Sequence, residues 1–267
     1  YIMIYHTFNP TILKLGFLEI RWYSLFYIIG LTIAYFMILY LSKNKKIKLS
    51  KDDVMDFVVY IAIGILIGGR LIYFIFYNPM TLISSPLEFF KLWHGGMSFH
   101  GGLIGTVIAG YIFCKIKKIN FWLMADLAVV PLGLALALGR IGNFINGELY
   151  GRVWNGSLCI NYTKNEHLNN LPELCRYPSQ LIESAKNLII FSVIWIIKDK
   201  KHPQGFLFWT FVTLYGLFRF FIEFIRQPDP QLGLFLGYLT MGQILCSVMI
   251  ITGTIMIIKL KIKFRKI

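Results

Sequence analysis

The amino-acid sequence predicts an all-α, polytopic membrane protein with seven transmembrane helices and a small polar head on its outer side. Of the 267 residues, 57% are hydrophobic and only 15% are charged. A soluble domain carries about 25% charged residues, so this chain has too few charges to cover a surface in water. The same composition excludes a disordered chain and a small disulfide-stapled secreted module.

Seven stretches are long and apolar enough to cross a bilayer, which takes about 20 mostly apolar residues. None of them alternates with the period of two that a membrane β-barrel shows. No repeat or long linker divides the chain, so we expect a single domain over residues 1–267. The predicted spans are 20–41, 54–77, 96–114, 121–138, 181–197, 204–225 and 235–258.

The placement of basic residues predicts the orientation in the membrane. The formal net charge is +14, which in a soluble protein would suggest a nucleic-acid partner. Here 16 of the 27 Lys and Arg lie on alternate connections, the pattern of cytoplasmic loops. We therefore expect the N-terminus outside, the C-terminus inside and no nucleic-acid partner. These basic residues are Lys43, Lys45, Lys46, Lys48, Lys51, Lys115, Lys117, Lys118, Lys198, Lys200, Lys201, Lys259, Lys261, Lys263, Arg265 and Lys266.

The connections on the opposite side, residues 78–95, 139–180 and 226–234, are rich in Gly, Asn, Arg, His and Glu. Segment 139–180 is too long and too polar for a simple turn, so it predicts a small head or lid. It contains Cys159 and Cys175, for which a disulfide and two free thiols both remain open. Function is expected on this outer side.

A charge inside a predicted span costs about 2.5–3.5 kcal/mol on insertion scales. Arg70, Arg219 and Glu223 are among the residues that carry one. The i,i+4 spacing of Arg219 and Glu223 places both on one helix face, where they can pair. One alternative is a structural ion pair or snorkelling near the membrane interface, and the other is a polar, water-filled cavity that faces a substrate. We favour the cavity.

A glycine-flanked histidine begins the third predicted span, within residues 94–105. His100 is a candidate general base, because imidazole titrates near neutral pH; the alternative is a histidine that only satisfies local hydrogen bonds. His94 and His100 lack the spacing of a zinc motif, and the chain has no Cys-x-x-Cys pair. No metal site is therefore expected.

The densest polar cluster is Gly-Arg-Ile-Gly-Asn-Phe-Ile-Asn-Gly-Glu-Leu-Tyr-Gly-Arg, residues 139–152. If this stretch is helical, Arg140, Asn143 and Asn146 share a side with Gly147. Arginine binds phosphate through its planar fork and keeps its charge when partly buried. The cluster therefore predicts a site for a phospholipid headgroup or another anionic group.

Residues 139–151 match, at every fixed position, the signature G-R-x-G-N-F-x-N-x-E-x-x-G, and the chain thereby resembles the prolipoprotein diacylglyceryl transferase family. Segments 21–23, 68–70, 94–102, 215–223, 226–229 and 241–243 also resemble family blocks. The resemblance implies transfer of the sn-1,2-diacylglyceryl group of phosphatidylglycerol to a thiol. The acceptor is the lipobox cysteine in a prolipoprotein signal peptide, at the first step of bacterial lipoprotein maturation.

The resemblance also implies a multi-pass enzyme of the bacterial inner membrane, with a periplasmic head and N-terminus, a cytoplasmic C-terminus and no cofactor. The thiol needs a base or a cationic environment to ionise, and the leaving phosphate needs positive charge. The catalytic residues implied are His100, Arg140, Arg219 and Tyr23. The residues implied to bind phosphatidylglycerol are Arg140, Asn143, Asn146, Glu148, Gly151, Tyr215, Arg219 and Glu223.

Two non-enzyme alternatives remain on the residues alone. Intramembrane arginines also suit an anion transporter, and the polar cluster also suits a lipid-binding scaffold. A transporter would more often show symmetry between its halves, which this sequence does not.

Overall fold

The computed structural model describes residues 2–16, 18–45, 47–154, 156–168, 174–227, 234–235 and 239–265. The chain forms two compact units, residues 1–33 with 128–267 and residues 34–127. Within the described residues, six helices are long and apolar enough to cross a membrane, and α7 (Phe206–Ile222) is a shorter apolar helix. The chain is therefore a polytopic membrane protein. The six long helices are α1 (Trp22–Asn44), α2 (Lys51–Tyr77), α4 (Phe99–Lys117), α5 (Phe121–Ile145), α6 (Ser179–Ile197) and α8 (Met241–Arg265).

Each of the seven predicted spans coincides with one of these helices, which confirms the fold class. The largest differences are at the ends. Helix α5 continues to Ile145, beyond the predicted end at residue 138, and α8 begins at Met241 rather than at residue 235. Gly139, Arg140 and Gly142 lower the local apolarity, but none of them removes the N–H that an α-helix requires. The first part of the signature is therefore helical.

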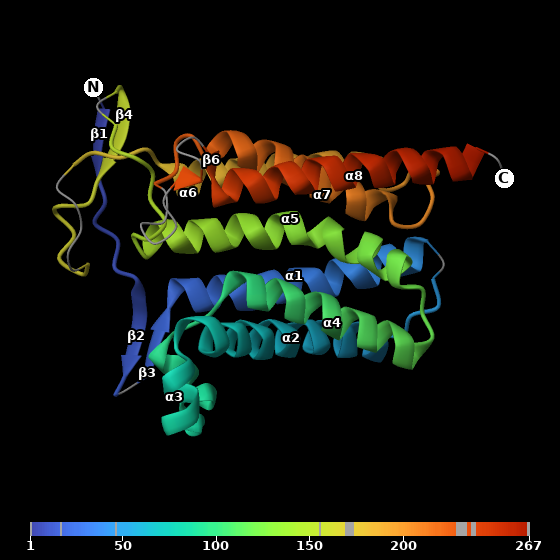
Figure 1. Ribbon diagram of the computed structural model, residues 1–267, viewed down its shortest axis with the longest axis horizontal. Coiled ribbons are helices and arrows are strands. Elements are labelled where there is room, and N and C mark those ends of the chain that lie inside the picture. The colour runs from blue at the N-terminus through green and yellow to red at the C-terminus, as the bar shows by residue number, and fades with distance from the viewer. Residues whose placement is uncertain are drawn as a thin grey trace. The chain divides into compact units, whose positions relative to one another are not determined.

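In the unit of residues 34–127, α2 and α4 pack against each other through glycines (Figure 1). A Cβ on Gly64 would lie 2.5 Å from the carbonyl oxygen of Gly105, and one on Gly101 would lie 2.2 Å from that of Gly68. The glycines are four residues apart on each helix, the small-xxx-small pattern of close membrane-helix contacts. The glycines beside His100 therefore serve helix packing. Along the chain, α2 is connected to α4 by α3 (Pro79–Ser84) and the 3-10 helices η1 (Pro86–Phe90) and η2 (Leu92–His94).

In the other unit, α7 contacts both α6 and α8 (Figure 1). Gly216 of α7 faces the backbone of Cys246 in α8, and an added Cβ would lie 3.0 Å from that carbonyl oxygen. The hydroxyl of Ser184 in α6 donates to the carbonyl oxygen of Ala137 in α5 at 3.0 Å. These contacts bring α5, α6 and α7 together, and the polar residues near one end of each helix form the site described below.

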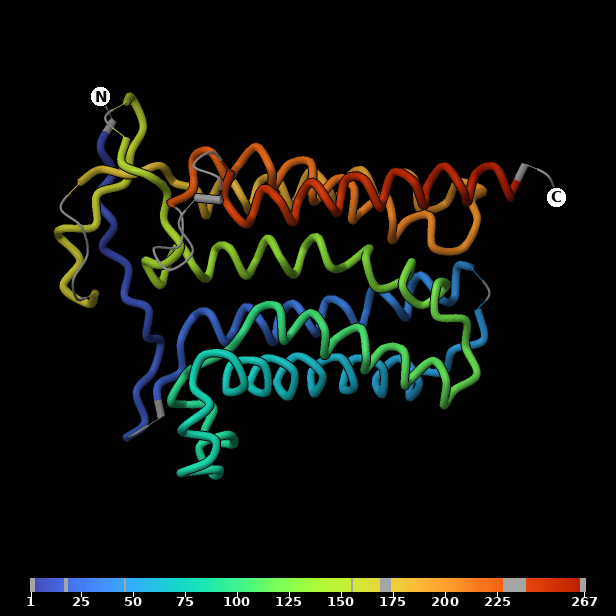
Figure 2. Tube along the Cα trace, viewed as in Figure 1, coloured from blue at the N-terminus to red at the C-terminus, as the bar shows by residue number. Residues whose placement is uncertain are grey.

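The polar segment after α5 contains strand β4 (Leu158–Asn161), which pairs in parallel with the N-terminal strand β1 (Ile2–Tyr5). Figure 2 shows the two traces side by side. Cys159 and Cys175 form a disulfide with their Cα atoms 5.5 Å apart, so the bridged alternative is confirmed. These strands were not predicted from the sequence, because β1 and β4 are each only four residues long.

Two further short antiparallel pairs lie in the same unit. Strands β2 (Thr11–Leu15) and β3 (Leu18–Arg21) form a hairpin that leads directly into α1. Strands β5 (Leu234–Phe235) and β6 (Leu239–Thr240) precede α8.

Candidate functional site

The candidate site is centred on Glu183, a carboxylate in the first turns of α6 whose side chain is only 2% exposed. Its oxygens lie 3.4 Å from Nε of Arg140, 3.3 Å from Nε of Arg219 and 3.1 Å from Nζ of Lys186. One buried carboxylate is therefore shared by three cations from three helices. A buried ionised group requires such partners, because desolvation penalises the charge.

The end of α5 gives the signature its shape. The amide of Glu148 donates to the carbonyl oxygen of Asn143 at 3.1 Å, and the amide of Gly147 to that of Phe144 at 3.0 Å. Gly147 has φ +66°, which is the left-handed residue of a Schellman helix end. This turn directs the Glu148 carboxylate back toward Asn143, whose Nδ2 donates to Oε1 at 2.8 Å. The Asn–Gly–Glu residues of the signature thus form the C-terminal turn of α5, which places the Glu148 carboxylate beside the last turn of that helix.

The same turn brings other predicted residues into one hydrogen-bonded group. Nδ2 of Asn146 donates to Oε1 of Glu148 at 3.3 Å, and Nη1 of Arg140 donates to Oδ1 of Asn143 at 3.4 Å. Asn143 is buried, whereas Glu148 is exposed. Arg140 therefore joins this group to the Glu183 cluster.

Helix α7 contributes the second predicted pair. Nη1 of Arg219 lies 2.5 Å from Oε2 of Glu223, so the i,i+4 pairing expected from the sequence is confirmed. The hydroxyl of Thr240 donates to Oε1 of Glu223 at 3.1 Å. Gly242 faces the same carboxylate, and a Cβ there would lie 2.8 Å from Oε1. The start of α8 therefore completes the surroundings of Glu223.

Two predicted tyrosines flank the arginines. Tyr215 lies one turn before Arg219 on α7 and interacts electrostatically with Arg140. Its ring lies under Lys186, whose Nζ is 3.8 Å from the ring centroid. Tyr23 is an electrostatic neighbour of Arg140, and its ring covers Gly142, where a Cβ would lie 3.0 Å from Cδ2. Both rings are half-buried and present a phenol beside a cation.

Gly151 lies where the head returns to the helices. It forms a β-bridge with Arg226, and a Cβ on it would lie 2.5 Å from Cβ of Tyr177 and 2.9 Å from the carbonyl oxygen of Ile225. At Gly151 the backbone of the head thus lies close to other segments of this chain, at Tyr177 and Ile225.

Nine of the ten predicted site residues lie in this unit. The contacts above link eight of them around Arg140 and Glu183, whereas Gly151 contacts Tyr177 and Ile225. His100 belongs to the other unit, where it is exposed in the first turn of α4 and its ring lies 5.8 Å from that of Phe99. Its role as a base stays a prediction.

Arg70, the other intramembrane arginine, has a different environment. It is 2% exposed, and its guanidinium donates to five backbone carbonyls of the segment that joins α2 to α4. A guanidinium has five N–H groups, so all of them are used. The environment of Arg70 is therefore structural, but it consists of backbone hydrogen bonds and not of the expected ion pair or snorkelling. The acceptors belong to Glu88, Phe89, Lys91, Gly95 and Gly96.

Glu183 and Lys186 were not predicted as site residues from the sequence. Both lie inside the predicted span 181–197 and are 2% exposed as side chains. The signal was present in the i,i+3 and i,i+4 spacing of polar residues along α6, which places them on one buried face. Those residues are Ser179, Gln180, Glu183, Ser184, Lys186 and Asn187.

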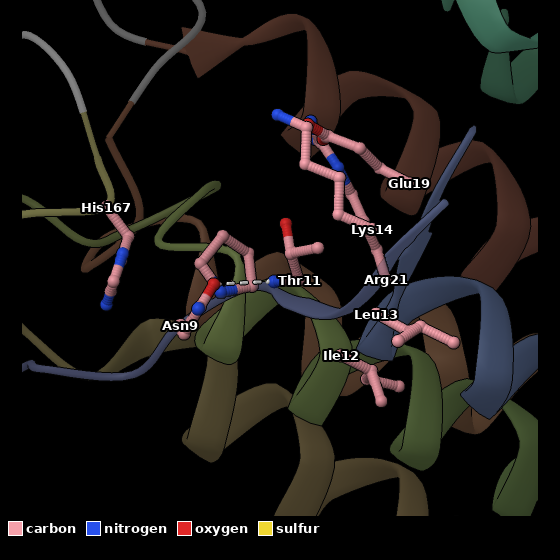
Figure 3. Close-up of a pocket in the computed structure, with 9 residues that line it drawn as sticks. Asn9, Thr11, Ile12, Leu13, Lys14, Glu19, Arg21 and His167 are labelled. Atoms are coloured by element: carbon pink, nitrogen blue, oxygen red, sulfur yellow. Dashed lines mark hydrogen bonds and ion pairs between the residues drawn. The ribbon is translucent and has the colours of Figure 1, made fainter. Parts of the chain in front are cut away.

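A separate hollow of about 500 Å³ lies against the β2–β3 hairpin (Figure 3). Lys14, Glu19, Arg21 and His167 are among its lining residues, and none of the predicted site residues is. The hydrogen bond from Arg21, together with Lys14, lowers the pKa of the Glu19 carboxyl. The charges of this hollow thus pair with each other. Among the described residues, no group of three His, Cys, Asp or Glu side chains gathers that could hold a metal ion.

Fold and site together define a multi-pass membrane protein whose helices enclose an arginine-rich polar site. The prolipoprotein diacylglyceryl transferase family matches this chain over residues 10–259. The chain belongs to that family.

Three relatives named phosphatidylglycerol–prolipoprotein diacylglyceryl transferase illustrate the similarity. The protein of Geobacter sulfurreducens is 43% identical over 249 residues, covering 93% of this chain and 94% of the relative. That of Desulfotalea psychrophila is 43% identical over 263 residues, covering 94% of each. That of Francisella tularensis subsp. tularensis is 41% identical over 265 residues, covering 98% of this chain and 97% of the relative.

Proposed function

We propose that this chain is an enzyme that transfers the diacylglyceryl group of phosphatidylglycerol to the cysteine thiol in the lipobox of a prolipoprotein signal peptide. The observation that carries the proposal is the convergence of Arg140 and Arg219 on the buried Glu183, within a member of this family. With Lys186, three cations surround one shared carboxylate there. Glu223 adds a second negative charge, so the group keeps an excess of positive charge that suits a phosphate.

The reaction forms a bond between the cysteine sulfur and the glyceryl carbon that carries the phosphate. The C–O bond to the phosphate breaks, the products are a thioether and glycerol 1-phosphate, and the thiol proton passes to a base. Arg140 and Arg219 stabilise the leaving phosphate in this scheme, because charge develops on its oxygens in the transition state. His100 is the proposed base.

The remaining predicted residues have supporting roles in the proposal. Asn143, Asn146 and Glu148 shape the polar side of the site, as their mutual hydrogen bonds suggest. Tyr23, Tyr215 and Glu223 hold the arginines in place. Gly151 permits the close approach of the head backbone, and we regard residues 1–267 as one functional domain.

The direct test is to incubate the purified full-length protein in phosphatidylglycerol vesicles with a lipobox peptide. We expect the peptide mass to increase by one diacylglyceryl group, and no increase when the peptide cysteine is replaced by serine. An unmodified cysteine peptide would reject the proposal. If phosphate crossed sealed vesicles instead while the peptide stayed unmodified, the anion-transporter alternative would be supported.

The role of His100 is tested separately with His100→Gln. We expect transfer to fall at neutral pH and to recover as pH rises, because the substrate thiol, with a free pKa of about 8.5, then ionises unaided. Arg219→Lys should show no such recovery, since its defect is not a missing proton acceptor. Full activity of His100→Gln at neutral pH would remove the histidine from the mechanism.

We further propose that the enzyme resides in the bacterial inner membrane with the head and N-terminus in the periplasm and the C-terminus in the cytoplasm. The basic residues on alternate connections support this orientation. The Cys159–Cys175 disulfide supports it independently, because disulfides persist in oxidising compartments such as the periplasm. A reporter fused after residue 267 should be active only in its cytoplasmic form, and a periplasmic signal would refute the orientation.

A further inference from the structure

His6, directly after β1, joins the N-terminal strand to the end of the signature helix. It is 1% exposed. Its Nε2 lies 2.7 Å from the carbonyl oxygen of Phe144 in the last turn of α5. Its own backbone amide donates to the carbonyl oxygen of Asn161 at 2.8 Å. One buried side chain therefore contacts the head and the signature at once.

The hydrogen bonds around His6 define its protonation state. A carbonyl oxygen only accepts, so Nε2 must carry a proton. The other nitrogen, Nδ1, lies 2.7 Å from Nδ2 of Asn165. The orientation of that amide is set by two further bonds, because Nδ2 of Asn165 also donates to the carbonyl oxygen of Phe8 and its Oδ1 accepts from the amide of His167. Nδ1 must therefore accept, and His6 is the neutral Nε2–H tautomer.

The Phe144 carbonyl lies within the turn that shapes the candidate site. It accepts from the amide of Gly147 as well as from His6. Asn143, Asn146 and Glu148, which hydrogen-bond one another, lie immediately around it in the chain. A displacement of this carbonyl would therefore move the groups beside Arg140.

A second link runs from His6 to the far side of the same turn. The ring of Tyr162 lies 4.8 Å from the imidazole of His6, centroid to centroid. Its hydroxyl accepts from Nε2 of Gln180 at 3.2 Å, and that Nε2 also donates to the backbone carbonyl of Glu148 at 2.8 Å. The head thus holds the signature turn at Phe144 and at Glu148.

We infer that neutral His6 is a positioning residue for transfer, which holds the end of α5 in its active arrangement and releases it when protonated. The inference rests on the proposed function for its activity readout. Protonation would place an N–H of His6 against the N–H₂ of Asn165, so the bond between them would be lost. The head would then be tied to the signature turn less firmly, and transfer would fall in acid.

The groups that face His6 determine the direction of the pH dependence. Phe8 and Phe144 contribute rings, Asn165 an amide, and Tyr162 the titratable side chain in contact with the imidazole. Burial raises the pKa of Tyr162 to about 12, so it stays neutral. Arg176 acts electrostatically on Tyr162, and Lys164 lies over the ring of Tyr5, the residue before His6.

Burial also lowers the pKa of His6 below its ordinary value of 6.5, with the hydrogen bond to Phe144 opposing the shift. The unfolded chain therefore binds a proton before the folded one does as the pH falls. The contribution of neutral His6 to stability is fully present above a pH of about 6.5. It is lost as the pH falls through the lower folded pKa.

The test compares wild type with His6→Gln in the full-length enzyme, because glutamine can donate and accept but does not titrate in this range. We expect His6→Gln to transfer within about threefold of wild type at pH 7.5. Wild-type activity divided by that of the variant should then fall as the pH drops below the His6 pKa, by at most about tenfold for each pH unit. The matched control is His167→Gln, the same change at an exposed histidine of the head. Its ratio to wild type should stay constant with pH.

A second measurement on the wild type needs no variant and no activity. Hydrogen exchange of the Gly147 and Glu148 amides, corrected for intrinsic rates, should lose protection as pH falls from 7.5 to 5, since both donate within the signature turn. Unchanged protection, or identical pH profiles for wild type and His6→Gln, would overturn the inference. Wild type without transfer at any pH would reject the proposed function instead, and the exchange data would still decide on His6.

Discussion

Two arginines within apolar helices, Arg70 and Arg219, have contrasting chemical environments. Arg70 has every N–H bonded to a backbone carbonyl and stacks on Phe74, 4.7 Å from the ring centroid. Arg219 is 11% exposed, and its contacts with the described residues are ion pairs to Glu183 and Glu223. The first arginine has no donor left for a ligand, whereas the second keeps donors and a counter-charge. The environment of an intramembrane arginine, not its presence, therefore separates the structural Arg70 from Arg219, which we propose binds the phosphate.

The largest expected effect is a loss of transfer activity when the arginines that pair with Glu183 are replaced. Arg140→Lys and Arg219→Lys should each reduce transfer about 10²–10³-fold, as losing one preorganised contact to a developing charge does. A lysine retains the charge but cannot reproduce the planar fork. Transfer to a lipobox peptide, measured beside the thermal midpoint, checks this. If either variant kept wild-type turnover, that arginine would not hold the phosphate.

Arg70→Lys should instead lower the stability of the protein and leave its activity nearly unchanged. Lysine has three N–H donors instead of five, so at least two bonds from a charged group are lost, each worth about 1.5–3 kcal/mol. We expect a lower thermal midpoint and less folded protein, with activity per folded molecule within about threefold of wild type. A fall in activity comparable to that of Arg219→Lys, at an unchanged midpoint, would place Arg70 in the functional class.

The pair of Glu183 and Lys186 should show a coupling of intermediate size. A double-mutant cycle with Glu183→Gln and Lys186→Met is expected to give about 0.5–3 kcal/mol, the range for residues in one network. Both side chains are 2% exposed, so solvent screens the pair little. Additive effects on the free energy of unfolding would show that Arg140 and Arg219 alone account for the burial of Glu183.

The smallest effect is expected for a similar ion pair near the helix ends. Lys117 in α4 lies 2.9 Å from Oδ2 of Asp56 in α2, with side chains 32% and 48% exposed. Exposed pairs typically contribute about 0.2–1 kcal/mol, so Asp56→Asn should barely change the thermal midpoint. A loss as large as that of Arg70→Lys would mean that exposure does not distinguish these pairs.

The contrast also shows what the sequence could predict. Hydropathy was enough for the spans, and i,i+4 spacing was enough for the Arg219–Glu223 pair. The sequence could not predict the role of Arg70. The backbone carbonyls that accept its hydrogen bonds belong to a segment between two helices, where no periodicity predicts which groups meet. Glu183 was not predicted because the high mean hydropathy of α6 concealed a charged residue on its buried face. The end of α5 was placed too early, since hydropathy does not register backbone hydrogen bonds.

The parallel pairing of β1 with β4 has a consequence for the order of assembly. Residues 2–5 are synthesised long before their partners, residues 158–161. At about 5–20 residues per second, the ribosome needs roughly 8–30 s to reach them. The N-terminal strand must therefore wait, unpaired, while four apolar helices enter the membrane. Chains arrested before residue 158 should be cleaved by an external protease within residues 2–16, whereas finished chains should resist. Strand β1, made before any of the apolar helices described above, would then be among the last segments to fold.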